Sequence, residues 1–441
     1  MELLDYFDRR MEGHPKVQWV GLPMTEAARD LLNVSARAER GRLPFLIPPP
    51  PTRRGPDEVL APEPVPEGAR VWRIGPKGPL RIKDAAELAR DGDVVEIEAG
   101  DYRGDVAVWN QSRLTIRAVN GAARLFADGS SAEGKAIWVI RNGEFDIANI
   151  DFIGARVSDG NGAGIRFEGG SLRLRHCLFW GNQFGLMTAG HEVAATARLS
   201  VESSEFAYSH VQGRWAHHLY AGTIDTLTVT GSYFHHTNTG HLLKSRARHN
   251  HILYNRFTDE SGGRASYELN FPNGGYVRLL GNFVQQQRDT ENSAMVAYGE
   301  EGYRWEDNQL LMGSNTLVND HPHGGRFLAI ASGATRVVST NNLWVGRGTF
   351  HVRDPWSSVN DHRVDVDLLF LPFRQDYRLR EAAAGRLRFL PHPEQAVAAS
   401  LAPTAQYVHP RQLVTLSSPP WVAGADQRPA LEAAAADGSS R

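Results

Sequence analysis

The sequence is poor in cysteine, in long apolar runs and in excess charge of either sign. Its single cysteine, Cys177, excludes an intrachain disulfide framework and a cysteine-rich zinc site. No apolar run approaches the ~18 residues that a membrane-spanning helix needs, so we expect no membrane span. The 48 Lys and Arg against 50 Asp and Glu give a net charge of -2, which argues against a nucleic-acid partner. The start, MELLDYFDRR, lacks the basic and apolar stretches of a secretory leader, and this leaves the localisation open.

Three regions differ in composition. Residues 1–70 hold an amphipathic stretch from Thr25 to about Arg40, which predicts a helix, and a proline-rich segment. Residues 44–66 carry 9 of the 24 prolines, which predicts an extended spacer or a strap along a surface. Residues 71–385 form the predicted main domain, and 386–441 a C-terminal extension that we expect to be partly disordered.

The main domain repeats short β-type runs that end on an apolar residue, at spacings of 23 to 33 residues. The repeated positions are Phe152, Phe179, Phe206, Phe234, Phe257, Val284, Leu317 and Leu343. This period is too short for a propeller blade of about 40–45 residues, and it fits one coil of three short strands. We therefore predict an all-β fold, a right-handed parallel β-helix. The 43 glycines, about 10% of the chain, suit the corners of its coils.

Asparagine recurs two residues before the apolar position, at Asn255, Asn282, Asn315 and Asn341. We expect these side chains to occupy left-handed bends and to hydrogen-bond from coil to coil, which makes the column structural. Upstream, IKDAAELARDGDVVEIEAGDY predicts a short N-terminal capping helix with Asp84 as its N-cap. Such a helix would cover the open edge of the first coil.

The helix followed by DGDVVEIEAGDY resembles the N-terminal cap of pectin-lyase-like β-helix proteins, and DYRLREAAAG at 376–385 is similar to their final strand. The resemblance covers about residues 75–385. It implies a superfamily of polysaccharide lyases, glycoside hydrolases, epimerases, esterases and phage tailspikes. Most of these proteins act on or bind acidic polysaccharides, and most are secreted or periplasmic. The resemblance thus implies an acidic polysaccharide as partner, while the oligomeric state stays open.

Histidine is concentrated in one segment, because 7 of the 17 histidines lie between residues 217 and 251. Spacings of 23 to 26 residues separate His218 from His241, and Lys244 from Glu268 and Asn270. Stacked coils would place such pairs side by side, about 5 Å apart. We therefore predict one polar patch on a sheet face. Its members are His218, Tyr220, His241, Lys244, Arg246, Tyr267, Glu268, Asn270 and Asn273.

These residue types suit β-elimination on a uronic-acid polymer. That reaction needs a group that neutralises the C5 carboxylate, a base for the C5 proton and an acid for the leaving O4. We predict His241 or Lys244 as the base and Tyr220 or Tyr267 as the acid. The predicted function is that of a polysaccharide lyase. Residues predicted to bind substrate are His218, Arg246, Glu268, Asn270 and Asn273.

The string LLKS, followed by ILYNRF, resembles the lysine-bearing coil of calcium-dependent alginate and chondroitin lyases with this fold. In that family the lysine is the base, an arginine on the next coil is the acid, and upstream carboxylates hold calcium. Lys244 matches the lysine, whereas Asn270 stands near the arginine position. Thr237 and Thr239 stand near the positions of the carboxylates. We therefore expect no cofactor, although the resemblance itself implies calcium.

Other functions fit the same residues. Lys244 and Glu268 could form an ordinary exposed ion pair, and aromatic residues such as Trp215 could extend a non-catalytic sugar-binding platform. A glycoside hydrolase would need two or three carboxylates, of which Glu268 is the clear one. A uronate epimerase uses the same proton abstraction as a lyase.

The histidines could also bind zinc or another metal. Doublets such as His217-His218 and His235-His236 are expected to point to opposite faces of a strand. Only one member of each doublet could then be a ligand, and we predict no metal at the patch.

Overall fold

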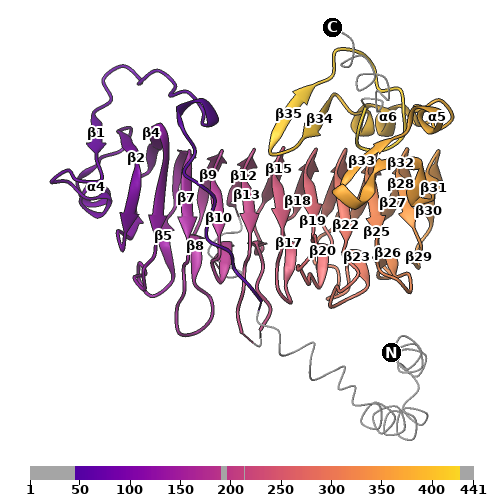
Figure 1. The fold of residues 1–441 in the computed structure, drawn as a ribbon, viewed down its shortest axis with the longest axis horizontal. Helices are drawn as coiled ribbons and strands as arrows, with labels where there is room; N and C mark the ends of the chain where they lie inside the picture. The colour runs from indigo at the N-terminus through magenta and orange to yellow at the C-terminus, as the bar shows by residue number, and fades with distance from the viewer. Residues whose placement is uncertain (1–44, 190–195, 213, 428–441) are drawn as a thin grey trace, which may run out of the picture. The chain divides into compact units, whose positions relative to one another are not determined.

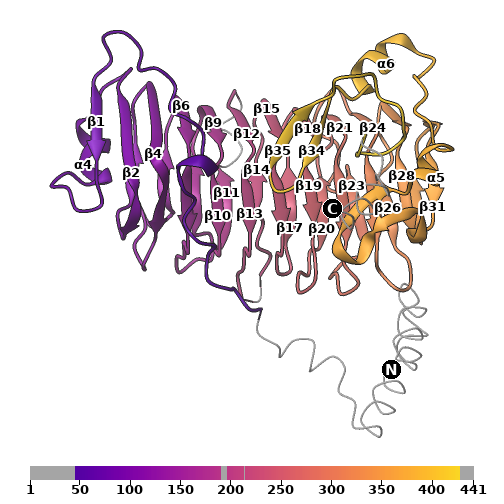
Figure 2. The same cartoon turned by 45° about the horizontal axis from the view of Figure 1, so that its top comes forward.

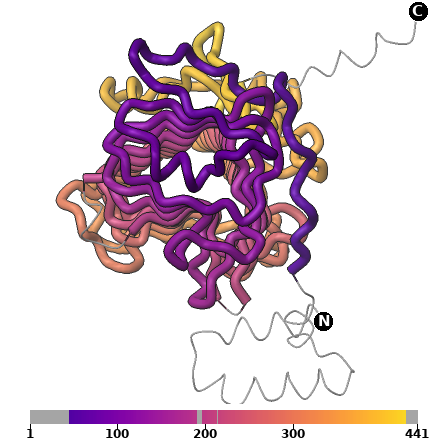
Figure 3. The backbone as a smooth tube through the Cα atoms, turned by 90° about the vertical axis from the view of Figure 1, so that its left-hand side faces the viewer, coloured from indigo at the N-terminus to yellow at the C-terminus, as the bar shows by residue number. Residues whose placement is uncertain are grey.

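The computed structural model describes residues 45–189, 196–212 and 214–427. The helix predicted from Thr25 to Arg40 and the tail from residue 428 onward lie outside these ranges. The main domain is a parallel β-solenoid, which confirms the predicted all-β parallel β-helix (Figure 1). An end-on view shows the successive coils lying behind one another (Figure 3).

The solenoid has three faces, and each full coil contributes one strand to each face, where it pairs in parallel with the strands of the adjacent coils. The first face is a ten-stranded sheet of β3 (Ala107–Trp109), β5 (Ala136–Ile140), β8 (Ala163–Phe167), β11 (Phe184–Thr188), β14 (Leu219–Ala221), β17 (His241–Ser245), β20 (Tyr267–Phe271), β23 (Ala294–Tyr298), β26 (Arg326–Ile330) and β29 (Thr349–Val352). The second face comprises β1 (Val71–Ile74), β2 (Val94–Arg103), β4 (Arg113–Phe126), β6 (Gly143–Ala148), β9 (Gly170–Arg175), β12 (Arg198–Glu202), β15 (Thr226–Thr230), β18 (His249–Leu253), β21 (Tyr276–Leu280), β24 (Gln309–Gly313), β27 (Arg336–Thr340) and β30 (Trp356–Val359). The long strands β2 and β4 continue into the third face, which adds β7 (Ile150–Ile153), β10 (Leu178–Trp180), β13 (Glu205–Ala207), β16 (Tyr233–His235), β19 (Arg256–Thr258), β22 (Phe283–Gln286), β25 (Thr316–Asn319), β28 (Leu343–Gly346) and β31 (His362–Val364).

The repeated apolar positions form a column inside the third face. Phe179 pairs in register with Phe206, and this register continues to Phe234 and Phe257. Their rings stack at centroid distances of 4.4 to 4.7 Å. The prediction is one residue off at the last coil, where Trp344 rather than Leu343 continues the column.

The asparagine column is present, with a similar shift. Asn255, Asn282, Asn315 and Asn342 are buried, and each backbone N–H donates to the Oδ1 of the next side chain at 2.9 Å, as far as Asn342. Asn341, the predicted member, is instead the left-handed residue before it, with φ of 57°. The prediction that the column asparagines occupy the left-handed bends is therefore wrong at Asn255, Asn282 and Asn315. On each of these coils the residue before the ladder asparagine has the positive φ.

We expect the Asn282→Ala variant to unfold at a clearly lower temperature. The Asn282 side chain accepts a hydrogen bond from Asn255 and donates one to the Ile252 carbonyl at 2.8 Å. Its loss therefore leaves these buried polar groups without their hydrogen-bond partner. Each such group costs about 1–3 kcal/mol. Circular dichroism during heating measures the effect, with exposed Asn110→Ala as the matched control. An equal, small shift in both variants would contradict a structural ladder.

The remaining elements lie at the ends and along the sides of the solenoid (Figures 1 and 2). They are η1 (Pro56–Glu58), α4 (Ile82–Leu88), η2 (Val366–Leu368), β32 (Leu369–Leu371), η3 (Pro372–Arg374), β33 (Asp376–Leu379), α5 (Glu381–Ala384), α6 (Gln395–Leu401), β34 (Ala405–Val408) and β35 (Gln412–Thr415). No helix among the described residues is long and apolar enough to span a membrane.

Details of the two ends differ from the sequence predictions. Arg81 rather than Asp84 is the N-cap of α4, and the Asp84 carboxylate accepts from the Arg81 backbone N–H at 2.9 Å. The segment from 376 does not form a final coil strand, because β33 pairs antiparallel with β32. Part of the proline-rich segment is bonded to the coils, since Leu60 and Asn149 exchange two hydrogen bonds of 2.9 and 3.0 Å.

Candidate functional site

The candidate site lies on the outer face of the first sheet, at β14, β17 and β20. Tyr220 pairs in register with Lys244, and Lys244 pairs with Asn270. The preceding residue of each strand is a core leucine, so the alternation of a strand turns these three side chains outward. The prediction that Lys244 and Asn270, 26 residues apart, lie side by side on adjacent coils is therefore confirmed. The prediction that Lys244 also lies beside Glu268 is wrong.

His218 and Glu268 do not belong to this face. Each is fully buried and is followed by a core leucine, Leu219 or Leu269, so that two successive side chains point inward. His218 is held inside by Ser209 Oγ at 2.7 Å and by the His235 carbonyl at 2.8 Å. The predictions assumed strict alternation along the strand, which fails at this corner of the coil. His217 takes the expected place of His218.

Three rings follow one another across the coils on this face. The His241 ring lies 4.4 Å from that of His217 and 5.0 Å from that of Tyr267, measured between centroids. The backbone N–H of His241 donates to His217 Nδ1 at 3.0 Å, so a neutral His217 carries its proton on Nε2. Trp215 is largely exposed, and the centroid of its ring lies 6.5 Å from that of the His241 ring.

Both imidazoles are held in the neutral state. Burial lowers the pKa of His217 to about 3, and the charges of Lys244 and Arg246 add to this effect. Burial, followed by His217 and the same two cations, lowers the pKa of His241 well below its usual value. The Nδ1 atom of His241 is buried without a hydrogen-bond partner among the described residues. His241 is therefore an uncharged ring with a spare nitrogen.

A glycine allows the coils to approach closely here. A Cβ atom on Gly240 would lie 1.5 Å from the Ala216 carbonyl oxygen, so no other residue fits without moving the backbone. Gly240 directly precedes His241, and Ala216 directly precedes His217. The close approach therefore sets the contact between the two histidine rings.

Two cations and one carboxylate form the second part of the site. Lys244 Nζ donates to Glu301 Oε1 at 3.0 Å, and Arg246 binds the other oxygen of Glu301. Arg246 Nε also donates to the Tyr220 hydroxyl at 3.0 Å, and its guanidinium binds Asn273 Oδ1. Burial alone would raise the pKa of Glu301, but hydrogen bonds from Arg246 and Lys244 outweigh it and lower the pKa.

A second carboxyl group lies next to the first. Asn270 donates a hydrogen bond to Glu300 Oε1. Burial raises the pKa of Glu300 above its usual value, in contrast to Glu301. Burial also raises the pKa of Tyr267, which keeps that phenol protonated. The site thus holds neutral proton acceptors and donors around one bound carboxylate.

The sequence predictions missed His217, Glu300 and Glu301. The run Gly299-Glu300-Glu301-Gly302 follows Asn270 and Asn273 by about one coil, and this spacing could have located it. His217 could not be chosen over His218 from the sequence, because the alternation of a strand does not tell which of two successive rings lies on the outer face.

The positions where the family resemblance implies calcium do not fit a calcium site. The hydroxyl of Thr237 donates to the Ala216 carbonyl at 3.0 Å, and that of Thr239 donates to the Arg214 carbonyl at 3.1 Å. Both side chains are therefore already bonded to the backbone, and neither is a carboxylate, the ligand that calcium sites use most.

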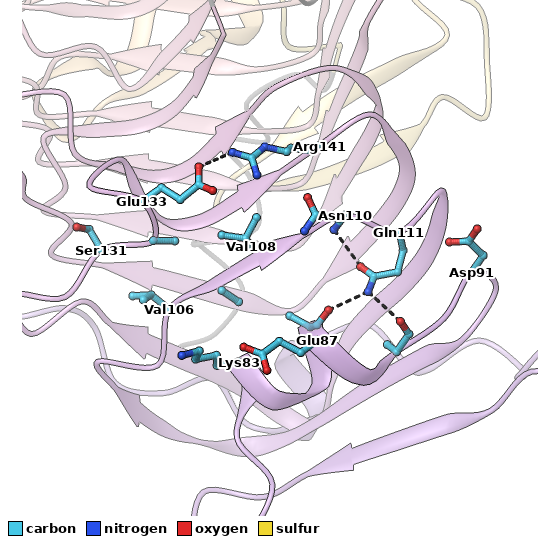
Figure 4. A pocket seen from close by; sticks show the side chains of 14 residues that line it. Lys83, Glu87, Asp91, Val106, Val108, Asn110, Gln111, Ser131, Glu133 and Arg141 are labelled. Carbon is cyan, nitrogen blue, oxygen red and sulfur yellow. Dashed lines mark hydrogen bonds and ion pairs between the residues drawn. The ribbon is translucent and has the colours of Figure 1, made fainter.

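A hollow of about 800 Å³ lies elsewhere, between α4 and the first strands of the ten-stranded sheet (Figure 4). Several of its polar side chains are engaged in structural contacts. Gln111 donates to the carbonyls of Ala86 and Ala89 at 2.9 Å, and Arg141 is paired with Glu133. No histidine is among the described residues that line this hollow, although Lys135 and Arg141 share the carboxylate of Glu133 at its edge.

Together, the fold and this face define a parallel β-helix protein with clustered ionisable side chains on one sheet. The fold is compatible with carbohydrate-active proteins. No protein-family model matches the chain, and no curated protein matches it. The chemistry of the site therefore has to carry the functional argument.

Proposed function

We propose that the protein is a polysaccharide lyase that cleaves a uronate-containing polymer by β-elimination. The observation that carries this proposal is the neutral His241 beside two cations that already hold a carboxylate. The same arrangement supplies the proton acceptor and the anion site that the reaction needs.

The carboxylate site is formed by Lys244 and Arg246. They bind the two oxygens of Glu301, whose side chain is 45% exposed, whereas the two cations are 9% and 13% exposed. A uronate carboxylate has the same chemistry as Glu301 and would compete with it for these buried donors. Hydrogen bonds and positive charge on the C5 carboxylate stabilise the negative charge that develops when the C5 proton leaves.

We assign His241 as the base and Tyr220 as the acid. Lys244 Nζ is engaged in an ion pair with Glu301, whereas His241 is neutral; because its Nδ1 is buried, Nε2 is the atom that would take the proton. His241 takes the C5 proton, the electron pair forms the C4–C5 double bond, and the C4–O4 bond breaks. The O4 atom receives the Tyr220 proton, and the Arg246 guanidinium at 3.0 Å stabilises the phenolate that remains.

Trp215 favours a second candidate function, a carbohydrate-binding surface without catalysis. The residue is 60% exposed and its ring lies next to that of His241, where a sugar ring can stack on it. In the lyase reading, the same ring orients a neighbouring sugar of the polymer.

The test is incubation with alginate, pectate, glycosaminoglycans and bacterial exopolysaccharides while the ultraviolet absorbance of the unsaturated product is followed. We expect one polymer to give a steady rise, and Arg246→Gln to raise KM at least tenfold because the carboxylate loses a donor. Arg278→Gln, on the second face, is the matched control and should behave as wild type. Binding of a polymer without any absorbance change would replace the lyase by the carbohydrate-binding surface.

A further inference from the structure

A second histidine cluster lies on the third face, away from the strands of the candidate site. The Nδ1 atoms of His235, at the end of β16, and of His236, the next residue, are 2.6 Å apart. A carboxylate oxygen of Glu260, just beyond β19, completes a group whose atoms all lie within 4.8 Å of one another. Two imidazole nitrogens and one carboxylate are a recurrent ligand set for divalent transition metals.

The backbone explains why this doublet converges. His236 has φ of 53°, in the left-handed region that residues other than glycine seldom adopt. This left-handed conformation interrupts the alternation of the strand, so both rings point to the same side. The sequence prediction that only one member of each doublet could be a ligand is therefore wrong for His235 and His236.

Outer contacts orient the two histidine rings. His235 Nε2 faces Glu205 Oε1 at 3.3 Å, so in the neutral ring Nε2 carries the proton and Nδ1 carries the lone pair. The His236 ring forms a hydrogen bond with the backbone of Ser261. A carboxylate or carbonyl behind a histidine is the usual support of a metal ligand.

The carboxylate is oriented in the same way. The hydroxyl of Thr258 donates to Glu260 Oε1 at 2.8 Å, and the hydroxyl of Tyr233 donates to the same oxygen. Oε2 takes no part in these two bonds. Tyr233 and Glu260 also line a hollow of about 380 Å³ beneath the C-terminal segments.

We propose that His235 Nδ1, His236 Nδ1 and Glu260 bind one divalent transition-metal ion of the Zn²⁺ type, with a fourth position open to water. At Zn–N lengths of about 2.0–2.1 Å, two ligand nitrogens of a tetrahedral site stand about 3.3 Å apart, so the rings separate by less than 1 Å on binding. The two Nδ1 atoms, which face each other at 2.6 Å, would both be ligands of this ion after that separation. Glu205 acts as a positioning residue behind His235.

The test uses untagged full-length protein that has been treated with EDTA and dialysed. Titration with CoCl₂ should give d–d absorption bands of a site with nitrogen ligands that saturate at one equivalent, and ZnCl₂ should displace them and raise the unfolding temperature. We expect His236→Gln and Glu260→Gln to abolish stoichiometric binding. Glu205→Gln should raise the Kd about 10–100-fold, as a supporting group does.

His241→Gln is the matched control, because it removes the corresponding histidine of the candidate site and should leave the cobalt spectrum unchanged. Circular dichroism establishes that each variant is folded, and the wild-type titration tests the proposal even where a variant is not. Absence of stoichiometric Co²⁺ and Zn²⁺ binding by folded wild type would overturn the proposal in favour of a proton shared between the two rings. Loss of binding in His241→Gln but not in His236→Gln would overturn it as well.

Discussion

Replacing His241 with alanine should lower kcat for the proposed elimination by about 10²–10⁴-fold, the usual contribution of a general base. The KM should change far less, because the proposed carboxylate site is formed by Lys244 and Arg246, whose side chains bind Glu301 rather than His241. Initial rates of product absorbance over a range of polymer concentrations separate the two constants. His251→Ala, on the neighbouring β18, provides a control for the loss of a half-buried histidine elsewhere on the coil.

The pH profile adds a test that a merely structural role would not pass. Because burial lowers the pKa of His241 well below its usual value, the ring stays unprotonated as the pH falls through about 6.5, the ordinary pKa of histidine. We expect kcat/KM of the wild type to stay flat through that region and to fall only at clearly lower pH. A rate that drops with a midpoint near 6.5, or a His241→Ala variant of full activity, would remove His241 as the base.

The fold could be predicted because one apolar residue recurs at the same place in each coil, which reveals the length of the coil. Phe152, Phe179 and Phe206 each fill the same place on successive coils, and a ring that stacks on its neighbour is hard to replace by a polar side chain. The last coil was misplaced by one residue because Leu343 and Trp344 are both apolar. Only the backbone register, which pairs Trp344 with Leu317, distinguishes them.

The site could be predicted only where each coil advances evenly. The pair Lys244 and Asn270 followed from spacing because both strands run straight through that position. At the start of the strands the chain turns a corner, and two successive residues face the core. This local geometry, rather than residue type, decides that the His217 ring lies on the outer face beside His241, whereas the His218 ring lies inside. Glu301 reaches the site from a loop, whose path the spacing of strands does not fix.

The misplaced Glu268 is itself a notable feature of the interior. Its carboxyl group is fully buried beneath the site, and neither oxygen has a hydrogen-bond partner among the described residues. Burial, followed by the nearby Asp259, raises the pKa of Glu268 well above its usual value. The strand register places it between the core residues Leu242 and Met295 of the adjacent coils. A carboxylic acid therefore occupies a position that its neighbours fill with apolar side chains.

We expect Glu268→Met to stabilise the protein by about 1–3 kcal/mol at pH 8, because it removes an unsatisfied buried polar group without leaving a cavity. The folded state keeps the Glu268 proton, whereas the unfolded state releases it above its ordinary pKa of about 4.3. Wild-type stability therefore falls as the pH rises from there toward the raised pKa, and the gain of the variant should grow over the same range.

Thermal unfolding of wild type and variant between pH 4 and pH 8 measures this difference, and Glu268→Gln separates charge from polarity. The glutamine cannot ionise but keeps buried polar atoms, so it should remove the pH dependence while recovering less stability than methionine. Equal destabilisation by both substitutions at every pH would instead mean that the acid has a partner inside the coil. If Glu268→Met is more stable yet inactive on a polymer that the wild type cleaves, then the buried acid serves the face above it, where Tyr267 and Asn270 lie on the same strand.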